Sequence, residues 1–231
     1  MSLPSKTRLL AAALRIMDTM AADKKPYDVR IGKNRIRVMP RVFSPKYFTD
    51  TAFFARHVPR IVGKRSFFEV GLGTGAIALA VRQNGARYVD GSDINGAAID
   101  NTIFNFGRHS HWIDVRQGSL FRPFGAAMYD VIFWNHPYHN VTEMPRGMIY
   151  RSGMDQRYVD LESYFRLAKE HLNPGGFMLL GTSNIARLRQ IFAFGKKYGY
   201  ERELLIRETA KFAHRLRQQI DLRIYKFTPV N

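Results

Sequence analysis

The sequence predicts an α/β fold in which helices cover both faces of a mostly parallel sheet. From residue 66 onward, short apolar segments of strand length alternate with amphipathic segments of helical length. This alternation is typical of parallel strands that are joined by helices. Two late strands, 202–207 and 219–227, have no helix between them, so we expect the sheet to end in an antiparallel hairpin.

Each expected element depends on its local pattern. The apolar run Phe67-Phe68-Glu69-Val70 predicts the first buried strand. Further strands are predicted at 87–91, 112–116, 130–134 and 177–181, and helices at 76–83, 96–106, 161–172 and 185–198. Turn residues at 173–176 should stop the third of these helices, and 140–160 should form a long loop beside the active site.

The first sixty residues predict a small extension. A helix is expected over 5–22 with Ser5 as its cap. A hairpin of strands 27–31 and 35–38 should follow, and then a helix over 51–58. We therefore expect an N-terminal extension, 1–60, and a main domain, 61–231. The N-terminal helix could also pair two subunits into a homodimer.

The composition predicts a soluble, cytoplasmic protein with an unusual charge. The sequence has no cysteine, which argues against disulfides and thiolate metal sites, and we expect no metal. No apolar run reaches the ~20 residues of a membrane span, so no membrane is expected as a partner. The net charge of +17 favours a polyanion such as RNA or a ribosome, although a solvated basic surface explains it as well. In the densest basic segment, 24–46, Asp28 is the one acidic residue. Its basic residues are Lys24, Lys25, Arg30, Lys33, Arg35, Arg37, Arg41 and Lys46.

A glycine-rich turn follows the first strand of the main domain. Gly71, Gly73 and Gly75 lie between that strand and a helix, where glycines let a ligand approach the backbone and the helix N-terminus. Asp93 ends the next strand about 20 residues later, where an acid can hold a ribose. These features indicate an adenosine-containing cofactor, and the alternative is a tight turn without a ligand. Glu69 argues against NAD, because a carboxylate repels a pyrophosphate but accepts an amine.

Two segments resemble motifs of the class I S-adenosylmethionine (SAM)-dependent methyltransferases. They are 69–75 and Gly91-Ser92-Asp93-Ile94, and the resemblance extends over roughly residues 43–182. It implies a Rossmann-like sheet of seven strands with an antiparallel last strand, and S-adenosyl-L-methionine as the cofactor. Ser119 stands where this family often has an acid that contacts the adenine amino group. The cofactor contacts that the resemblance implies are Thr51, Glu69, Gly71, Gly73, Thr74, Gly75, Asp93, Ile94, Ser119, Leu120 and Asn135.

The tetrapeptide Asn135-His136-Pro137-Tyr138 follows the very apolar strand 130–134. It is similar to the Asn-Pro-Pro-Tyr motif of methyltransferases that act on adenine N6 or on glutamine amides. The Asn135 side-chain carbonyl and the His136 backbone carbonyl can accept both N–H groups of an –NH2, which aims the nitrogen lone pair at a methyl donor. Tyr138 can stack on a planar acceptor. The expected catalytic residues are Asn135, His136 and Tyr138, and the expected substrate contacts are Pro137, Tyr138, His139 and Arg151.

His136 replaces the first proline of that motif. An imidazole with an ordinary pKa near ~6.5 could act as a base or contact the substrate, and it could equally pack or face solvent. Upstream, Val42-Phe43-Ser44-Pro45 and Asp50-Thr51 resemble a segment of the release-factor and ribosomal-protein glutamine methyltransferases. Asp50 has the alternative role of a helix cap.

The sequence leaves three functions open. The first is a SAM-dependent N-methyltransferase that acts on a glutamine amide, an adenine amino group or a small-molecule amine. The second is a small-molecule natural-product enzyme, including one that cyclises SAM to azetidine-2-carboxylate with release of methylthioadenosine. The third is a non-catalytic SAM-fold subunit that binds RNA.

Overall fold

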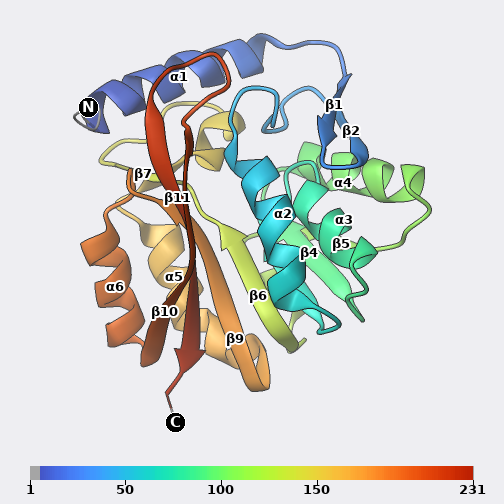
Figure 1. The fold of residues 1–231 in the computed structure, drawn as a ribbon, viewed down its shortest axis with the longest axis vertical. Helices are drawn as coiled ribbons and strands as arrows, with labels where there is room; N and C mark the ends of the chain where they lie inside the picture. The colour runs from blue at the N-terminus through green and yellow to red at the C-terminus, as the bar shows by residue number, and fades with distance from the viewer. Residues whose placement is uncertain (1–5, 231) are drawn as a thin grey trace.

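The computed structural model describes residues 6–230, which form a seven-stranded sheet flanked by helices (Figure 1). The strand order across the sheet is β10-β11-β9-β6-β3-β4-β5. Every neighbouring pair is parallel except the two that involve β11, which runs against both β9 and β10. The predicted fold class, including the antiparallel last strand, is therefore confirmed. The strands are β3 (Phe67–Val70), β4 (Val89–Asp93), β5 (Asp114–Gln117), β6 (Tyr129–Asn135), β9 (Leu172–Ser183), β10 (Tyr200–Lys211) and β11 (Gln219–Pro229).

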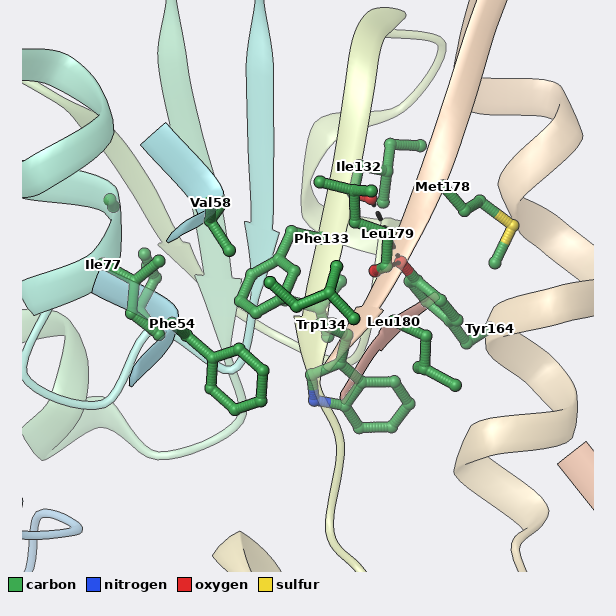
Figure 2. Close-up of a cluster of buried hydrophobic side chains, with 14 of the residues drawn as sticks. Phe54, Val58, Ile77, Ile132, Phe133, Trp134, Tyr164, Met178, Leu179 and Leu180 are labelled. Atoms are coloured by element: carbon green, nitrogen blue, oxygen red, sulfur yellow. Dashed lines mark hydrogen bonds between the residues drawn. The ribbon is translucent and has the colours of Figure 1, made fainter. Parts of the chain in front are cut away.

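Successive side chains of β6 point to opposite faces of the sheet (Figure 2). They are buried on both faces because helices cover both. Phe133 packs on Phe54, with ring centroids 5.6 Å apart. Trp134 packs edge-on to Tyr164 on the other face, at 5.3 Å. The continuous apolar sequence of β6 thus reflects burial on both sides. The helices on the face of Phe54 are α2 (Asp50–Val62), α3 (Ala76–Gln83) and α4 (Gly96–Arg108) (Figure 1). Those on the face of Tyr164 are α5 (Val159–Leu167) and α6 (Leu188–Lys197) (Figure 1).

The N-terminal segment consists of α1 (Lys6–Ala22) and a hairpin of β1 (Tyr27–Ile31) and β2 (Asn34–Val38). The expected cap Ser5 lies outside the described residues. The hairpin is fastened to α4 because Asn101 and Asn105 donate to the Arg37 carbonyl and accept from backbone N–H groups of β2 and Met39. The expected boundary at residue 60 falls inside α2, so the two-part division stays a prediction.

Three local predictions were wrong. The segment 140–160 is not one long loop, because β7 (His139–Val141) pairs in parallel with β8 (Met154–Gln156) around a 3-10 turn, η2 (Met148–Ser152). The helix expected over 161–172 becomes 3-10 at η3 (Ala168–His171), and the expected turn at 173–176 lies within β9. There the register with β6 shifts, and a Cβ on Gly176 would approach three carbonyl oxygens at 2.9–3.1 Å. The turn residues therefore form a bulge rather than a helix stop.

Most other helix and strand boundaries differ from the predicted ones by a few residues. The helix expected to end at 58 continues through Pro59 to Val62, because Val58 and Val62 are both buried. A further 3-10 turn, η1 (Arg122–Phe124), precedes β6. Within residues 6–230, no helix is long and apolar enough to cross a membrane.

Close packing between α2 and the sheet gives a stability prediction. A Cβ on Gly181 would lie 2.7 Å from the Phe54 ring and 3.1 Å from Phe133, whereas a Cβ on Gly107 in α4 would meet nothing within 4 Å. Gly181→Ala should lower the free energy of unfolding by ~1–3 kcal/mol, because both rings must move. Gly107→Ala should raise it by ~0.5–1 kcal/mol, because alanine favours helix. Urea unfolding measures both, and a neutral Gly181→Ala would contradict the packing.

Candidate active site

One cavity opens at the carboxyl ends of β3, β4 and β6, where ligands bind in open α/β sheets. All but one of the residues predicted as cofactor or substrate contacts line it. The exception is Gly75, which precedes α3 in the left-handed region (φ 72°) and packs against Thr102. The predicted residues on the wall are Thr51, Glu69, Gly71, Gly73, Thr74, Asp93, Ile94, Ser119, Leu120, Asn135, His136, Pro137, Tyr138, His139 and Arg151.

The glycine turn has the backbone conformation that its sequence predicts. Gly71 and Gly73 have φ of 70° and 56°, in the left-handed region that favours glycine. The Gly71 N–H donates to the Ser92 carbonyl at 2.8 Å, which ties the turn to β4. A Cβ on Gly71 would lie 3.1 Å from Trp134 Nε1. A side chain there would therefore be strained and crowd the indole that forms part of the cavity wall.

Glu69 places a buried carboxylate at the foot of the cavity. It is only 1% exposed, and its Oε2 has no hydrogen-bond partner among the described residues. Burial raises the pKa of Glu69 well above its ordinary value, and a backbone hydrogen bond from Ala78 opposes this. An unpaired buried carboxylate oxygen is costly unless a ligand donates to it. The site therefore suits a cationic donor such as an ammonium group.

Asp93 lies at the end of β4. Its two carboxylate oxygens accept backbone N–H groups of Gly73 at 2.9 Å and Asn95 at 2.8 Å. Burial raises the pKa of Asp93, and these two hydrogen bonds oppose the shift. Each oxygen keeps a lone pair for another donor, such as a vicinal diol. Ile94 and Leu120 provide apolar wall beyond it, suited to a flat ring.

A three-residue network occupies the other end of the cavity. Asn135 Nδ2 donates to Asp50 Oδ2 at 3.0 Å, which fixes which way the amide points. The Tyr138 hydroxyl lies 2.8 Å from Asn135 Oδ1 and 3.3 Å from Asp50 Oδ2, and it can donate to either. Asp50 also accepts the Thr51 N–H at 2.9 Å, within the first turn of α2. The amide oxygen of Asn135 therefore keeps one free lone pair.

Asp50 is a site residue that the sequence left between two roles, a member of the upstream Asp-Thr segment and a helix cap. Thr49, not Asp50, precedes α2 as its cap residue, and Asp50 is the first residue of the helix. Its side chain is buried, and burial raises its pKa while the bonds from Asn135, Thr51 and Tyr138 oppose the shift. The available signal was its place beside Thr51 in the upstream segment.

The His136 ring is buried and does not face solvent. Its Nε2 lies 2.8 Å from Thr182 Oγ1, and its Nδ1 has no partner in the described part of the chain. Burial lowers the pKa of His136 to about 3, so the ring is neutral at pH 7. So weak a base is poorly suited to general-base catalysis at neutral pH. The geometry thus favours the packing role, while the backbone carbonyl of His136 remains available.

Two further predicted substrate contacts are the buried His139 and the more exposed Arg151. Burial lowers the pKa of His139 to about 4, and its ring meets Phe212 edge-on at 6.5 Å. Arg151 forms an ion pair with Asp160 at 2.9 Å. Both side chains line the cavity, so both stay predicted contacts.

Sequence reasoning missed the apolar wall around the acceptor end. It comes from α1, from the segment before α2, from η2 and from the β10–β11 hairpin, which are spread along the whole sequence. Met17 of α1 fits closely, since a Cβ on Gly153 would lie 2.2 Å from its Cε. Only the wide apolar face of the first helix hinted at this contact. The added wall residues are Ala13, Met17, Phe43, Phe48, Ile149, Phe212 and Ile220.

The sequence matches the model of one family, the methyltransferase small domain, over residues 33–212. The chain belongs to the methyltransferase small domain family. Members of this family use S-adenosyl-L-methionine, and the cavity fits that cofactor. Glu69 has an unpaired oxygen for its ammonium, and Asp93 has lone pairs for its ribose hydroxyls.

Two relatives are similar in sequence to this methyltransferase-family chain. The release factor glutamine methyltransferase of Geobacter sulfurreducens is 27% identical over 184 residues, covering 73% of this chain and 64% of that protein. A Methanocaldococcus jannaschii protein named as a protein N5-glutamine methyltransferase is 24% identical, covering 77% of this chain and 90% of its own length.

A solved structure shares the fold. The T. thermophilus 16S rRNA N2 G1207 methyltransferase, in complex with AdoMet and guanosine, superimposes with a TM-score of 0.64 at 15% identity. The match covers 89% of this chain and 50% of that one. The chain thus spans less than two thirds of the release factor methyltransferase and half of the rRNA methyltransferase.

The burial of His136 gives a pH prediction. Its folded-state pKa of about 3 lies below the ordinary 6.5, so the unfolded chain takes up the proton first. The stability that depends on the neutral ring is present above pH 6.5 and is lost as pH falls toward 3. Between pH 7 and 5, His136 should lower the free energy of unfolding of the wild type by about 2 kcal/mol. The variant His136→Gln has no imidazole at this site, so its free energy of unfolding should fall by that much less over the same pH range. Equal losses in variant and wild type would contradict the burial.

The unpaired Glu69 oxygen gives a binding prediction. Glu69→Gln should weaken S-adenosyl-L-methionine binding by ~10- to 100-fold, because a charge-assisted hydrogen bond is lost. The free energy of unfolding at pH 8 should not fall, because a buried charge is removed. Calorimetric titration and urea unfolding measure the two quantities. Unchanged cofactor affinity would show that Glu69 has only a structural role.

Proposed function

We propose that this protein transfers a methyl group from S-adenosyl-L-methionine to a planar –NH2 group, such as a glutamine amide or the exocyclic amine of a nucleobase. One observation carries the proposal. The Asn135 nitrogen donates to Asp50, so the Asn135 oxygen, which accepts from Tyr138, keeps one lone pair for a further donor in the cavity. An acceptor at this point suits a substrate that donates N–H.

The chain's residues hold the cofactor and the acceptor at opposite ends of one cavity. S-adenosyl-L-methionine supplies an electrophilic methyl group when it is bound. Glu69 would bind its ammonium, Asp93 its ribose hydroxyls, and the wall around Ser119 and Leu120 its base. Asn135, the last residue of β6, stands at the acceptor end.

Asn135 Oδ1 and the His136 carbonyl would accept the two N–H groups of the substrate. This arrangement turns the nitrogen lone pair out of the plane of its substituents and stabilises the positive charge that develops on nitrogen. The nitrogen becomes strongly acidic as it gains the methyl group, so its proton can pass to water without a strong base. A neutral, weakly basic His136 is consistent with this chemistry.

The relatives favour methyl transfer to an amide over the other functions. Both sequence relatives are named as glutamine methyltransferases, which supports a glutamine side chain as the acceptor. The enzyme that shares the fold is named for methyl transfer to N2 of a guanosine in rRNA, so a nucleobase amine is the second acceptor class that we propose. None of these three is named as an enzyme that cyclises SAM, so they lend no support to that reaction.

Product analysis tests the proposal directly. The protein is incubated with methyl-deuterated S-adenosyl-L-methionine, with and without a glutamine-containing peptide or an unmodified RNA. Mass spectrometry then looks for S-adenosylhomocysteine and a labelled acceptor. Formation of methylthioadenosine in place of S-adenosylhomocysteine would overturn methyl transfer.

The acceptor network gives a mutational prediction. Asn135→Ala should lower kcat by ~100-fold, because one of the two oriented acceptors is lost. Asp50→Asn should lower kcat by ~10-fold, because an amide at position 50 can donate as well as accept and so no longer selects one orientation of the Asn135 amide. Cofactor affinity should stay within ~2-fold in Asp50→Asn and should fall much less than kcat in Asn135→Ala, since Glu69 and Asp93 are the residues assigned to the ammonium and the ribose.

Exposed Glu201→Gln on β10 is the matched control and should leave kcat unchanged. If Asp50→Asn instead impaired only cofactor binding, its role in orienting Asn135 would be refuted.

A further inference from the structure

The β1–β2 hairpin and the adjoining side of α4 form a strongly basic surface. We call it the hairpin–α4 face and define it by residues of the hairpin, of the segment after it and of α4. Six basic residues on it stand against two acidic ones, Asp28 and Asp100. Its cations and its one exposed aromatic ring are Arg30, Lys33, Arg35, Arg37, Arg41, Arg108 and Phe104.

The register of the hairpin explains why the cations share one side. Asp28 pairs with Arg37, and Arg30 pairs with Arg35, so all four side chains point away from the core-facing residues of the hairpin. Arg35, Arg37 and Arg108 all form ion pairs with Asp28, at 2.6, 3.0 and 2.9 Å. One carboxylate cannot neutralise three guanidinium groups, so the cluster keeps an excess positive charge.

An exposed aromatic ring lies among the cations of the hairpin–α4 face. Phe104 of α4 is 43% exposed, and the Arg37 guanidinium lies 5.9 Å from its ring centroid. Phe104 borders a shallow groove between the hairpin and α4, whose other walls include Pro26, Met39 and Arg41. Arg41 has a φ of 65°, which is uncommon for a residue with a side chain, and Asn95 Nδ2 holds its carbonyl at 2.8 Å. The backbone at this wall of the groove is thus held by the residue that precedes α4.

The groove adjoins the active-site cavity. The first turn of α4 separates them: Asn95 and Ala98 line the cavity, whereas Ala97 and Asp100 line the groove. The segment that leaves the groove at Arg41 reaches the cavity wall at Phe43. A long ligand on the hairpin–α4 face can therefore extend toward the acceptor end.

We infer that the hairpin–α4 face binds single-stranded RNA, with its phosphates on the arginines and an unpaired base on Phe104. Guanidinium groups bind phosphate oxygens in a bidentate manner, and aromatic side chains stack on exposed bases. RNA presents unpaired bases beside a continuous phosphate backbone. An acidic peptide would match the charge but offers no base for the ring.

This surface is separate from the catalytic residues, and its binding is measured without cofactor. A lack of RNA binding would therefore leave the proposed methyl transfer untouched. A lack of methyl transfer would likewise leave RNA binding by the hairpin–α4 face untouched.

Fluorescence anisotropy with a labelled, mixed-sequence single-stranded RNA tests the inference. The variant is Arg30→Glu with Lys33→Glu, because both side chains are exposed and neither forms a hydrogen bond or ion pair within residues 6–230. Its Kd should rise by at least ~10-fold, and the slope of log Kd against log salt should fall by ~1.4, for two lost phosphate contacts. The matched control, Lys64→Glu with Lys196→Glu, makes the same charge change at exposed residues of other elements and should shift Kd by less than ~3-fold.

A second pair of variants tests the stacking. Phe104→Ala should weaken binding of the single strand by ~5-fold or more, and should leave binding of the same RNA annealed to its complement nearly unchanged. Ile103→Ala, at the exposed neighbouring residue, is the control and should change neither. Thermal unfolding verifies that all variants fold.

Three results would overturn the inference. They are no binding of RNA by the wild type, equal weakening by the Arg30/Lys33 and Lys64/Lys196 pairs, and a preference for polyglutamate or phosphatidylserine vesicles over RNA. The second result would mean that net charge alone attracts the RNA. The third would assign the face to an acidic protein or a membrane surface.

Discussion

Parallel pairing of β3 with both β4 and β6 is the constraint on which the site depends. Val70 lies opposite Ser92 on one side and Trp134 on the other, so the three strands end at the same level. One residue further, β4 and β6 place Asp93 and Asn135 at that edge, while in β3 the buried Glu69 lies one residue before Val70. Glu69, Asp93 and Asn135 meet around one cavity for this reason, although they are dispersed through the sequence.

The site collects buried ionisable groups that a stability-optimised core would avoid. Glu69 has an unpaired oxygen, Asp50 has its pKa raised by burial, and His136 is held neutral. Each of these groups costs folding free energy that the apolar sheet core must offset. Glu69 and Asp50 have a reason to remain, since one can bind a cation and the other orients an amide. Perturbed acids that converge on one cavity are typical of functional sites.

The sequence predicted the sheet and its antiparallel strand because these depend on local patterns, whereas the cofactor contacts came from a family resemblance and stay predicted. The alternation of strand-length and helix-length segments predicted the strands, and the glycines at 71 and 73 predicted the turn, where the structure has positive φ. The role of Asp50 could not be predicted, since it depends on α2 packing beside the end of β6, a contact across 85 positions. The bulge at 173–176 was mistaken for a helix stop because the same residue types serve both structures.

The acceptor end of the cavity is walled by the two most distant parts of the chain. Met17 and Ala13 come from α1, while Phe212 and Ile220 come from the hairpin that closes the sheet (Figure 1). During synthesis the N-terminal part leaves the ribosome first, and β11 must then insert between β9 and β10. The predicted cofactor contacts, by contrast, all lie at or before the last residue of β6 in the sequence. A chain under synthesis therefore contains every cofactor contact well before it contains the hairpin that closes the acceptor end.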